Sequence, residues 1–192
     1  MAEPQHRLLV LTDAAGCPRP LAAQVGRALR GGPFTLLLRE KHLAWDRRRS
    51  LAGRLEALLA PTGGELLVAD PLEPVCGAHL SARYPVPEPR PACLGRSVHA
   101  GAPHPAEADY ITYSPVWATD SKPGYGPAVG LAGLAERVAA SPVPVYALGG
   151  VTGPDRALAA RRAGAAGVAV MGAVMRADEP ERVVAALRAA LG

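Results

Sequence analysis

Short apolar runs alternate with longer amphipathic segments along most of the chain. The runs at 7–13, 34–41 and 65–70 are rich in Leu and Val and end in charged residues, a pattern typical of strands buried on both faces. Further strands are predicted at 77–80, 94–99, 109–117, 143–150 and 167–175. Helical spacing and stop signals predict helices at 21–32, 50–60, 130–140, 154–164 and 179–191.

Regular alternation of strands and helices predicts a parallel sheet, and eight strands with short connections favour its closure. We therefore expect residues 1–192 to form a single (β/α)8 TIM barrel domain, with a doubly wound open sheet as the alternative. The chain has 192 residues, and a typical barrel of this kind has about 250. The missing residues fall in the middle of the chain, where we expect shortened helices and a Pro-rich loop at 81–92.

Composition adds two constraints. Hydrophobic residues make up 49% of the chain but aromatic residues only 4%, so the core is built mainly from Ala, Val and Leu. The formal net charge of +4 suits an anionic, phosphorylated ligand. We interpret the basic run Arg47-Arg48-Arg49 as the solvated first turn of a helix and expect no nucleic-acid partner.

The three cysteines, Cys17, Cys76 and Cys93, are odd in number and lack metal-binding spacing, which favours reduced thiols in a cytoplasmic protein. The N-terminal segment lacks the pattern of a signal peptide. Apolar stretches are too short to cross a bilayer, so we expect no membrane partner. The oligomeric state stays open, although small barrels often form homo-oligomers.

Glycine-rich segments follow the last two predicted strands. Gly149-Gly150 end one strand, and the next passes at Met171-Gly172 directly into a helical turn. Backbone amides at such places bind phosphate in (β/α)8 barrels, so we expect a phosphate site here. The alternative interpretation of Gly149 and Gly150 is a tight turn without a ligand.

Polar residues also follow other predicted strands. Arg39 and Lys41 alternate onto one side of their strand, which suits an anionic ligand, with a surface salt-bridge cluster as the alternative. The loop 119–127 carries Thr119 and Lys122 as phosphate partners and is either a lid or an ordinary exposed loop.

Two histidines lie at predicted strand ends. His79 and His99 are each either structural or an acid–base group working near neutral pH. Asp70 could bind Mg²⁺ or cap the next turn, but a single carboxylate is weak evidence for a metal.

The motifs LVLTD, LLLREK, GAHL, GRSVH, DYITYSPVWATDSKPGYGP, YALGGV and GAAGVAVMGAVM, in this order, resemble those of the thiamine phosphate synthase / thiazole tautomerase (TenI) family over nearly the whole chain. The resemblance implies a (β/α)8 barrel that acts on a thiazole phosphate. It places six residues on the thiazole-phosphate positions: Thr119, Lys122, Gly149, Gly150, Met171 and Gly172.

Departures from the family pattern concern the diphosphate and Mg²⁺ side of the site. Leu37 stands where the synthase motif has Gln, Ala69-Asp70 replace its Asn-Asp pair, and 81–84 lack its second metal carboxylate. These losses favour a tautomerase-like isomerase, without a metal cofactor, acting on a thiazole carboxylate phosphate in thiamine or related sulfur-heterocycle biosynthesis. The alternatives are the synthase, a transferase using Mg²⁺ and Asp70, and a non-catalytic barrel that binds thiazole phosphate.

The tautomerase interpretation needs a group that moves a proton. A histidine with that role in some tautomerases falls on Pro115 here. We therefore take His79, His99, Lys41 and Ser114 as candidate catalytic residues, with Ser114 orienting the substrate and Arg39 joining the phosphate-binding set. The exact substrate and the general base stay open at this stage.

Overall fold

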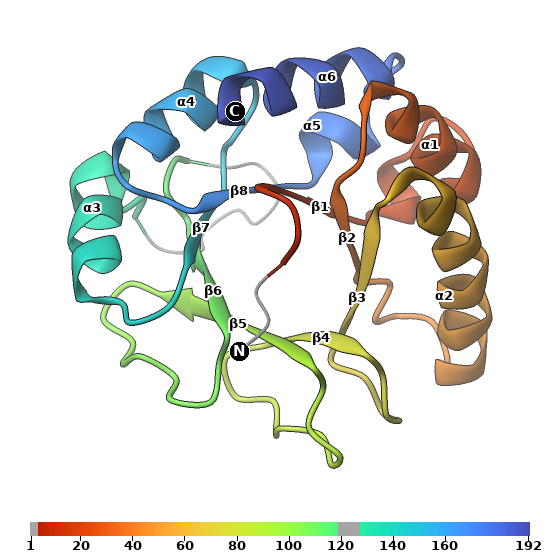
Figure 1. Cartoon of the computed structure of the whole chain (residues 1–192), viewed down its shortest axis with the longest axis horizontal. Helices are drawn as coiled ribbons and strands as arrows, with labels where there is room; N and C mark the ends of the chain where they lie inside the picture. The colour runs from red at the N-terminus through yellow and green to blue at the C-terminus, as the bar shows by residue number, and fades with distance from the viewer. Residues whose placement is uncertain (1–3, 119–126) are drawn as a thin grey trace.

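The computed structural model describes residues 4–118 and 127–192. Eight parallel strands pair in sequence order, and β8 pairs with β1, so the sheet is a closed barrel (Figure 1). The strands are β1 Leu8–Leu11, β2 Thr35–Leu38, β3 Glu65–Ala69, β4 Gly77–Leu80, β5 Cys93–His99, β6 Tyr110–Ser114, β7 Val145–Leu148 and β8 Gly167–Val170. The predicted barrel is confirmed, and the open-sheet alternative is wrong.

Helices cover part of the outside of the barrel (Figure 1). They are α1 Leu21–Ala28, α2 Trp45–Leu59, α3 Gly130–Ala140, α4 Pro154–Arg162, α5 Gly172–Met175 and α6 Pro180–Leu191, with 3-10 turns at η1 Ala14–Gly16, η2 Leu29–Gly31 and η3 Ala60–Thr62. The connections from β3 to β4, β4 to β5 and β5 to β6 lie wholly within the described residues and contain no helix. The expected shortening is therefore a complete loss of helices there. None of the helices described is long and apolar enough to cross a membrane.

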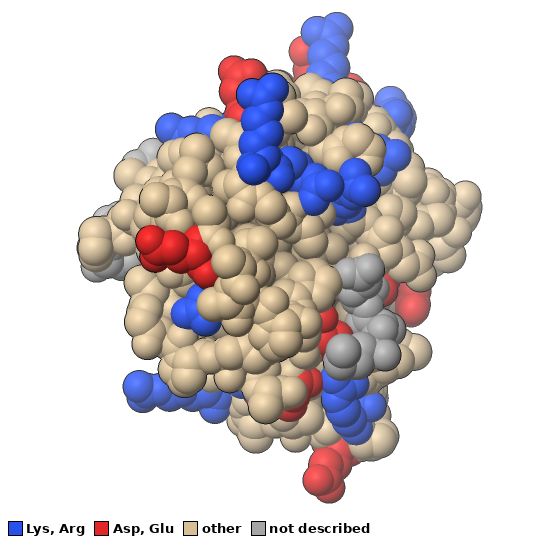
Figure 2. Space-filling model, turned by 60° about the vertical axis from the view of Figure 1, so that its left-hand side comes forward, with Lys and Arg blue, Asp and Glu red and all other residues tan. Residues whose placement is uncertain are grey.

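Helix α2 starts at Trp45, five residues before the predicted start at 50. The basic run is its first turn, as expected, with Arg47 and Arg49 exposed. Arg48 differs from that prediction because it is buried and its guanidinium lies 4.8 Å from the centre of the Trp45 ring. On the face shown in Figure 2, basic side chains lie in small groups, several of them near acidic ones.

Alternation along the strands separates two cores. Leu9, Leu11, Leu37 and Leu67 point into the barrel, and their neighbours in sequence point outward to the helices. The buried Tyr110 fills the interior beside Gly95, where an added Cβ would lie 2.1 Å from its ring. Because side chains fill the interior of the barrel, the active site is expected at the carboxyl ends of the strands.

A loop takes the place of a helix outside β4 and β5. Tyr84 packs there on a small cluster that includes Leu80 and Leu94. Arg96 is buried behind this loop and donates to the carbonyl oxygens of Ser81, at 2.9 Å, and Tyr84, at 2.8 Å. Its guanidinium also forms an ion pair of 2.6 Å with Glu107. Arg96 therefore attaches the loop to the barrel.

We expect Arg96→Met to lower the free energy of unfolding by about 2 kcal/mol, because the loop carbonyls lose a charged donor. Urea unfolding of both proteins measures this change. The control is Arg182→Met, which removes an exposed Arg paired with Glu179 on α6. Equal losses in the two variants would contradict the role of Arg96.

Candidate active site

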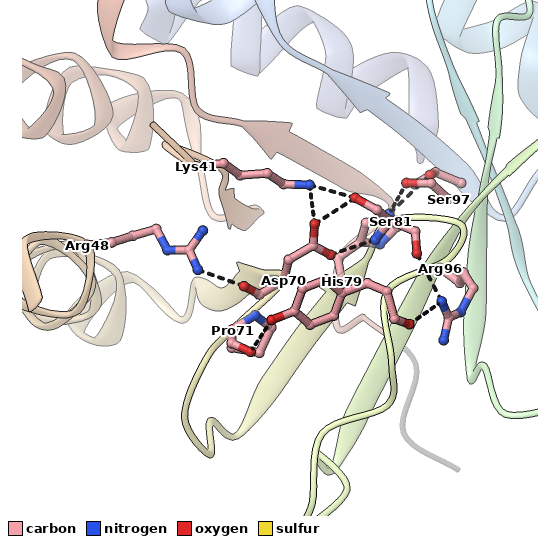
Figure 3. A network of polar contacts seen from close by, with 10 residues as sticks. Lys41, Arg48, Asp70, Pro71, His79, Ser81, Arg96 and Ser97 are labelled. Atoms are coloured by element: carbon pink, nitrogen blue, oxygen red, sulfur yellow. Dashed lines mark hydrogen bonds and ion pairs between the residues drawn. The ribbon is translucent and has the colours of Figure 1, made fainter. Parts of the chain in front are cut away.

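Polar side chains gather at the carboxyl ends of the strands, where (β/α)8 barrels place their active sites. Lys41 follows β2, Asp70 follows β3 and Ser81 follows β4, and their side chains point toward one another (Figure 3). Leu37 points into the barrel, and alternation carries Arg39 and Lys41 to the same side. The parallel strands thus bring residues that are far apart in sequence to one corner.

Asp70 is the centre of this corner. Lys41 Nζ donates to Asp70 Oδ2, and the Ser81 hydroxyl donates to the same oxygen at 2.6 Å. The Ser81 backbone N–H donates to Asp70 Oδ1 at 2.7 Å. Burial raises the pKa of Asp70, but the hydrogen bonds from Lys41 and Ser81 outweigh it, so the pKa lies below its ordinary value. The carboxylate is therefore ionised at neutral pH.

The backbone of Asp70 fixes the direction of its carboxylate. Its φ of 40° lies in the left-handed region, which Asp tolerates better than most residues. Arg48 of α2 donates to the Asp70 carbonyl oxygen at 2.7 Å. The buried Arg48 therefore supports the site from helix α2 (Figure 3).

Arg39 reaches from the end of β2 toward β8. Its backbone N–H donates to Thr12 Oγ1 at 2.9 Å. Its guanidinium Nη1 lies 2.9 Å from the sulfur of Met171, the residue between β8 and α5. This contact joins the end of β2 to the segment predicted to bind phosphate.

The Gly149-Gly150 turn is held close to the end of β6. Both glycines have positive φ, 95° and 69°. An added Cβ would lie 2.9 Å from Pro115 Cα at Gly149 and 2.6 Å from the Ala118 oxygen at Gly150. The turn therefore requires glycine at both positions. Gly172 begins α5 directly after β8, and the phosphate role of both segments stays a prediction.

A polar network lies inside the barrel. His79 Nδ1 lies 2.9 Å from the Tyr110 hydroxyl, and Nε2 lies 3.0 Å from Ser97 Oγ and 3.3 Å from Thr112 Oγ1. Burial lowers the pKa of His79 to about 3, so its ring is neutral near pH 7. Sequence reasoning missed Tyr110 and Thr112, although the alternation of 109–117 places both on the inward face.

His99 and Ser114 lie together where β5 and β6 end. His99 Nδ1 lies 3.1 Å from the Ser114 carbonyl oxygen and 3.2 Å from its hydroxyl. The ring is partly exposed. Thr119 and Lys122, the other predicted phosphate partners, lie outside the described residues.

The residues at the Asp70 corner do not fit a protein-bound Mg²⁺ ion. Within 4–118 and 127–192, no three or more His, Cys, Asp or Glu side chains gather as metal ligands. Among the residues labelled in Figure 3, Asp70 alone carries a carboxylate, and both its oxygens already accept hydrogen bonds. Tyr84 of the 81–84 segment packs outside the barrel, and its hydroxyl donates to the Pro71 oxygen at 3.0 Å.

Comparison with known proteins gives a consistent result. The family described as thiamine monophosphate synthase matches residues 8–174. Thiamine-phosphate synthase of Salinibacter ruber is 36% identical, covering 96% of this chain and 88% of that protein. That of Salinispora tropica is also 36% identical, covering 96% and 97%. The structure of thiamine phosphate pyrophosphorylase from Pyrococcus furiosus has a TM-score of 0.81 at 25% identity, covering 96% and 95%.

These relatives correct the expected activity. The isomerase prediction is wrong, because proteins similar over almost the whole chain carry the name of the synthase, a transferase. The prediction gave too much weight to Leu37, Ala69 and the missing carboxylate in 81–84. Family membership, expected from the motifs, is confirmed. The chain belongs to the thiamine monophosphate synthase family.

Proposed function

We propose that the chain is a thiamine-phosphate synthase that joins a pyrimidine diphosphate to a thiazole phosphate and releases diphosphate. The observation that carries this proposal is the 36% identity to a synthase over 96% of the chain. The geometry supports it because two anionic substrates need two sets of phosphate-binding groups. Lys41, after β2, belongs to one set, and the glycine segments after β7 and β8 form the other.

Arg39 and Lys41 have the charge that the transfer requires. Negative charge develops on the diphosphate as it leaves, and fixed cations lower the energy of that transition state. The Lys41 side chain is 42% exposed and its ammonium is held by Asp70, so it can contact a ligand without rearrangement of its anchor. The Arg39 guanidinium, beside Met171, lies between the two sets of groups.

The remaining polar residues have orienting roles in this proposal. The neutral His79 ring fixes the Ser97 hydroxyl inside the barrel mouth. The pair of His99 and Ser114 presents a second polar contact for the substrate. Gly149 and Gly150 bind the thiazole phosphate through backbone amides. A cytoplasmic location and a homo-oligomer stay predictions.

A direct assay tests the proposal. The full chain is incubated with the pyrimidine diphosphate, the thiazole phosphate and Mg²⁺, and thiamine phosphate is quantified after oxidation to a fluorescent product. We expect multiple turnovers per protein molecule. Failure to form product, with the chain folded by circular dichroism and both substrates intact, would overturn the proposed function.

We expect Arg39→Gln to lower kcat/KM of this synthesis by about 10- to 100-fold, because a hydrogen bond to a charged group contributes roughly 1.5–3 kcal/mol. Initial rates at varied concentrations of the diphosphate substrate measure the change. Arg182→Gln, a charge-matched change on α6, should retain full activity. Equal rates for Arg39→Gln and the unmodified chain would remove Arg39 from the site.

A further inference from the structure

The corner formed by Lys41, Asp70 and Ser81 lies where the family pattern expects metal ligands. We propose that this corner binds a diphosphate group through the Lys41 ammonium, with no divalent cation held by the protein. The inference rests on the proposed function only in taking diphosphate as the ligand. It concerns how this chain neutralises that ligand's charge.

The Lys41 ammonium occupies the position beside the Asp70 carboxylate that a metal ion would need. The ammonium donates to Asp70 Oδ2 and lies 2.7 Å from Ser81 Oγ, while Ser81 also binds both carboxylate oxygens. Every oxygen of Asp70 therefore has a partner from the protein. A divalent ion at this carboxylate would have to displace the Lys41 ammonium against the repulsion of like charges.

Burial and exposure assign different roles to the two charged groups. The Asp70 side chain is only 11% exposed, whereas the Lys41 side chain is 42% exposed. Asp70 thus lies deeper in the protein than Lys41, whose side chain reaches solvent. An ammonium has three donors, and Lys41 uses two of them on Asp70 and Ser81, so one remains for a phosphate oxygen while both bonds are kept.

The neighbouring positions contribute no second acidic ligand. Ala69 precedes Asp70 and has no ligating atom, and it points into the apolar interior of the barrel. Tyr84 packs against Leu80 and Leu94 on the outer face of the sheet. A Mg²⁺ site needs carboxylates and waters in near-octahedral geometry, and one carboxylate already bound to an ammonium does not supply it.

Calorimetric binding of inorganic pyrophosphate to the full chain tests the inference. One titration uses metal-stripped buffer with EDTA, and the other uses millimolar Mg²⁺. We expect dissociation constants within about threefold of each other. Binding that is more than tenfold tighter with Mg²⁺ would overturn the inference, as would no binding in either buffer.

The affinities of single-residue variants for pyrophosphate test where it binds. In EDTA, Lys41→Gln should weaken binding at least tenfold, Lys41→Arg should keep part of the affinity, and Arg182→Gln should keep all of it. Asp70→Asn removes a negative charge near the ligand, so binding should be equal or tighter in both buffers. A loss of affinity in Asp70→Asn that appears only with Mg²⁺ would identify Asp70 as a metal ligand and overturn the inference.

A separate titration uses Mn²⁺ alone, read from its electron paramagnetic resonance signal. We expect the free chain to leave this signal unchanged at micromolar concentrations, and loss of the signal would contradict the inference. The two proposals fail separately. Metal-independent pyrophosphate binding without product formation would overturn only the proposed function, whereas synthesis with strictly Mg²⁺-dependent pyrophosphate binding would overturn only this inference.

Discussion

Gly95→Ala is expected to lower the free energy of unfolding by about 3 kcal/mol. This cost lies at the upper end of the range for overpacking a protein core. The added Cβ would lie 2.1 Å from the Tyr110 ring, which is fully buried. That ring cannot move away easily, because it also packs edge-on against Tyr146 and its hydroxyl contacts His79. Equilibrium unfolding in urea, followed by circular dichroism, measures the loss.

Two further variants identify the cause of this loss. Gly53→Ala, where an added Cβ on α2 meets nothing within 4 Å, should stabilise the chain by about 0.5–1 kcal/mol. In a Tyr110→Leu background, the cost of Gly95→Ala should fall below about 1 kcal/mol, because the clash is removed. An unchanged cost in that background would show that Tyr110 is not the obstacle.

The order of strands was predictable because each forms a short apolar run. Segment 77–80 was predicted with the bounds that β4 has, and 130–140 with those of α3. Other strands are shorter than predicted: β2 is Thr35–Leu38 within 34–41, since an apolar run does not mark the last hydrogen bond of a ladder. Chain length predicted that the helices are shortened, and the close spacing of the predicted middle strands correctly placed that shortening between β3 and β6.

The interaction partners of the charged side chains were not predictable from the sequence. Arg48 lies in a basic run that suggests a solvated turn, whereas in the structure it is buried between the Trp45 ring and the Asp70 carbonyl oxygen. The pairing of Lys41 with Asp70 joins two residues that are 29 positions apart, one after β2 and the other after β3. Such contacts depend on the closed barrel, which brings every strand end to one rim.

The interior network was partly predictable. The sequence predicts His79 at a strand end, but it predicts its neighbours Tyr110 and Thr112 only as part of a strand. Alternation places Tyr110, Thr112 and Ser114 on one face, so the polar side of β6 was visible in the sequence. Its meeting with His79 required the register of β4, β5 and β6.

His79 should make stability depend on pH. The pKa of its ring is about 3 in the folded chain and about 6.5 in an unfolded one, so the unfolded chain takes up a proton first as pH falls. The contribution of His79 is therefore complete above about pH 6.5 and is lost progressively toward pH 3. The expected slope is about 1.4 kcal/mol per pH unit, or roughly 3 kcal/mol between pH 6 and 4.

Urea unfolding at several pH values between 4 and 7 measures this slope. His79→Gln should be less stable than the unmodified chain at pH 7, because the bonds to Tyr110 and Ser97 weaken, yet it should lose less stability on acidification. Carboxylates contribute to the slope in both proteins, so the difference between the two curves isolates His79. If His79→Gln and the unmodified chain lose stability in parallel, the buried ring is not the group that titrates, and its neutral role in the barrel interior is refuted.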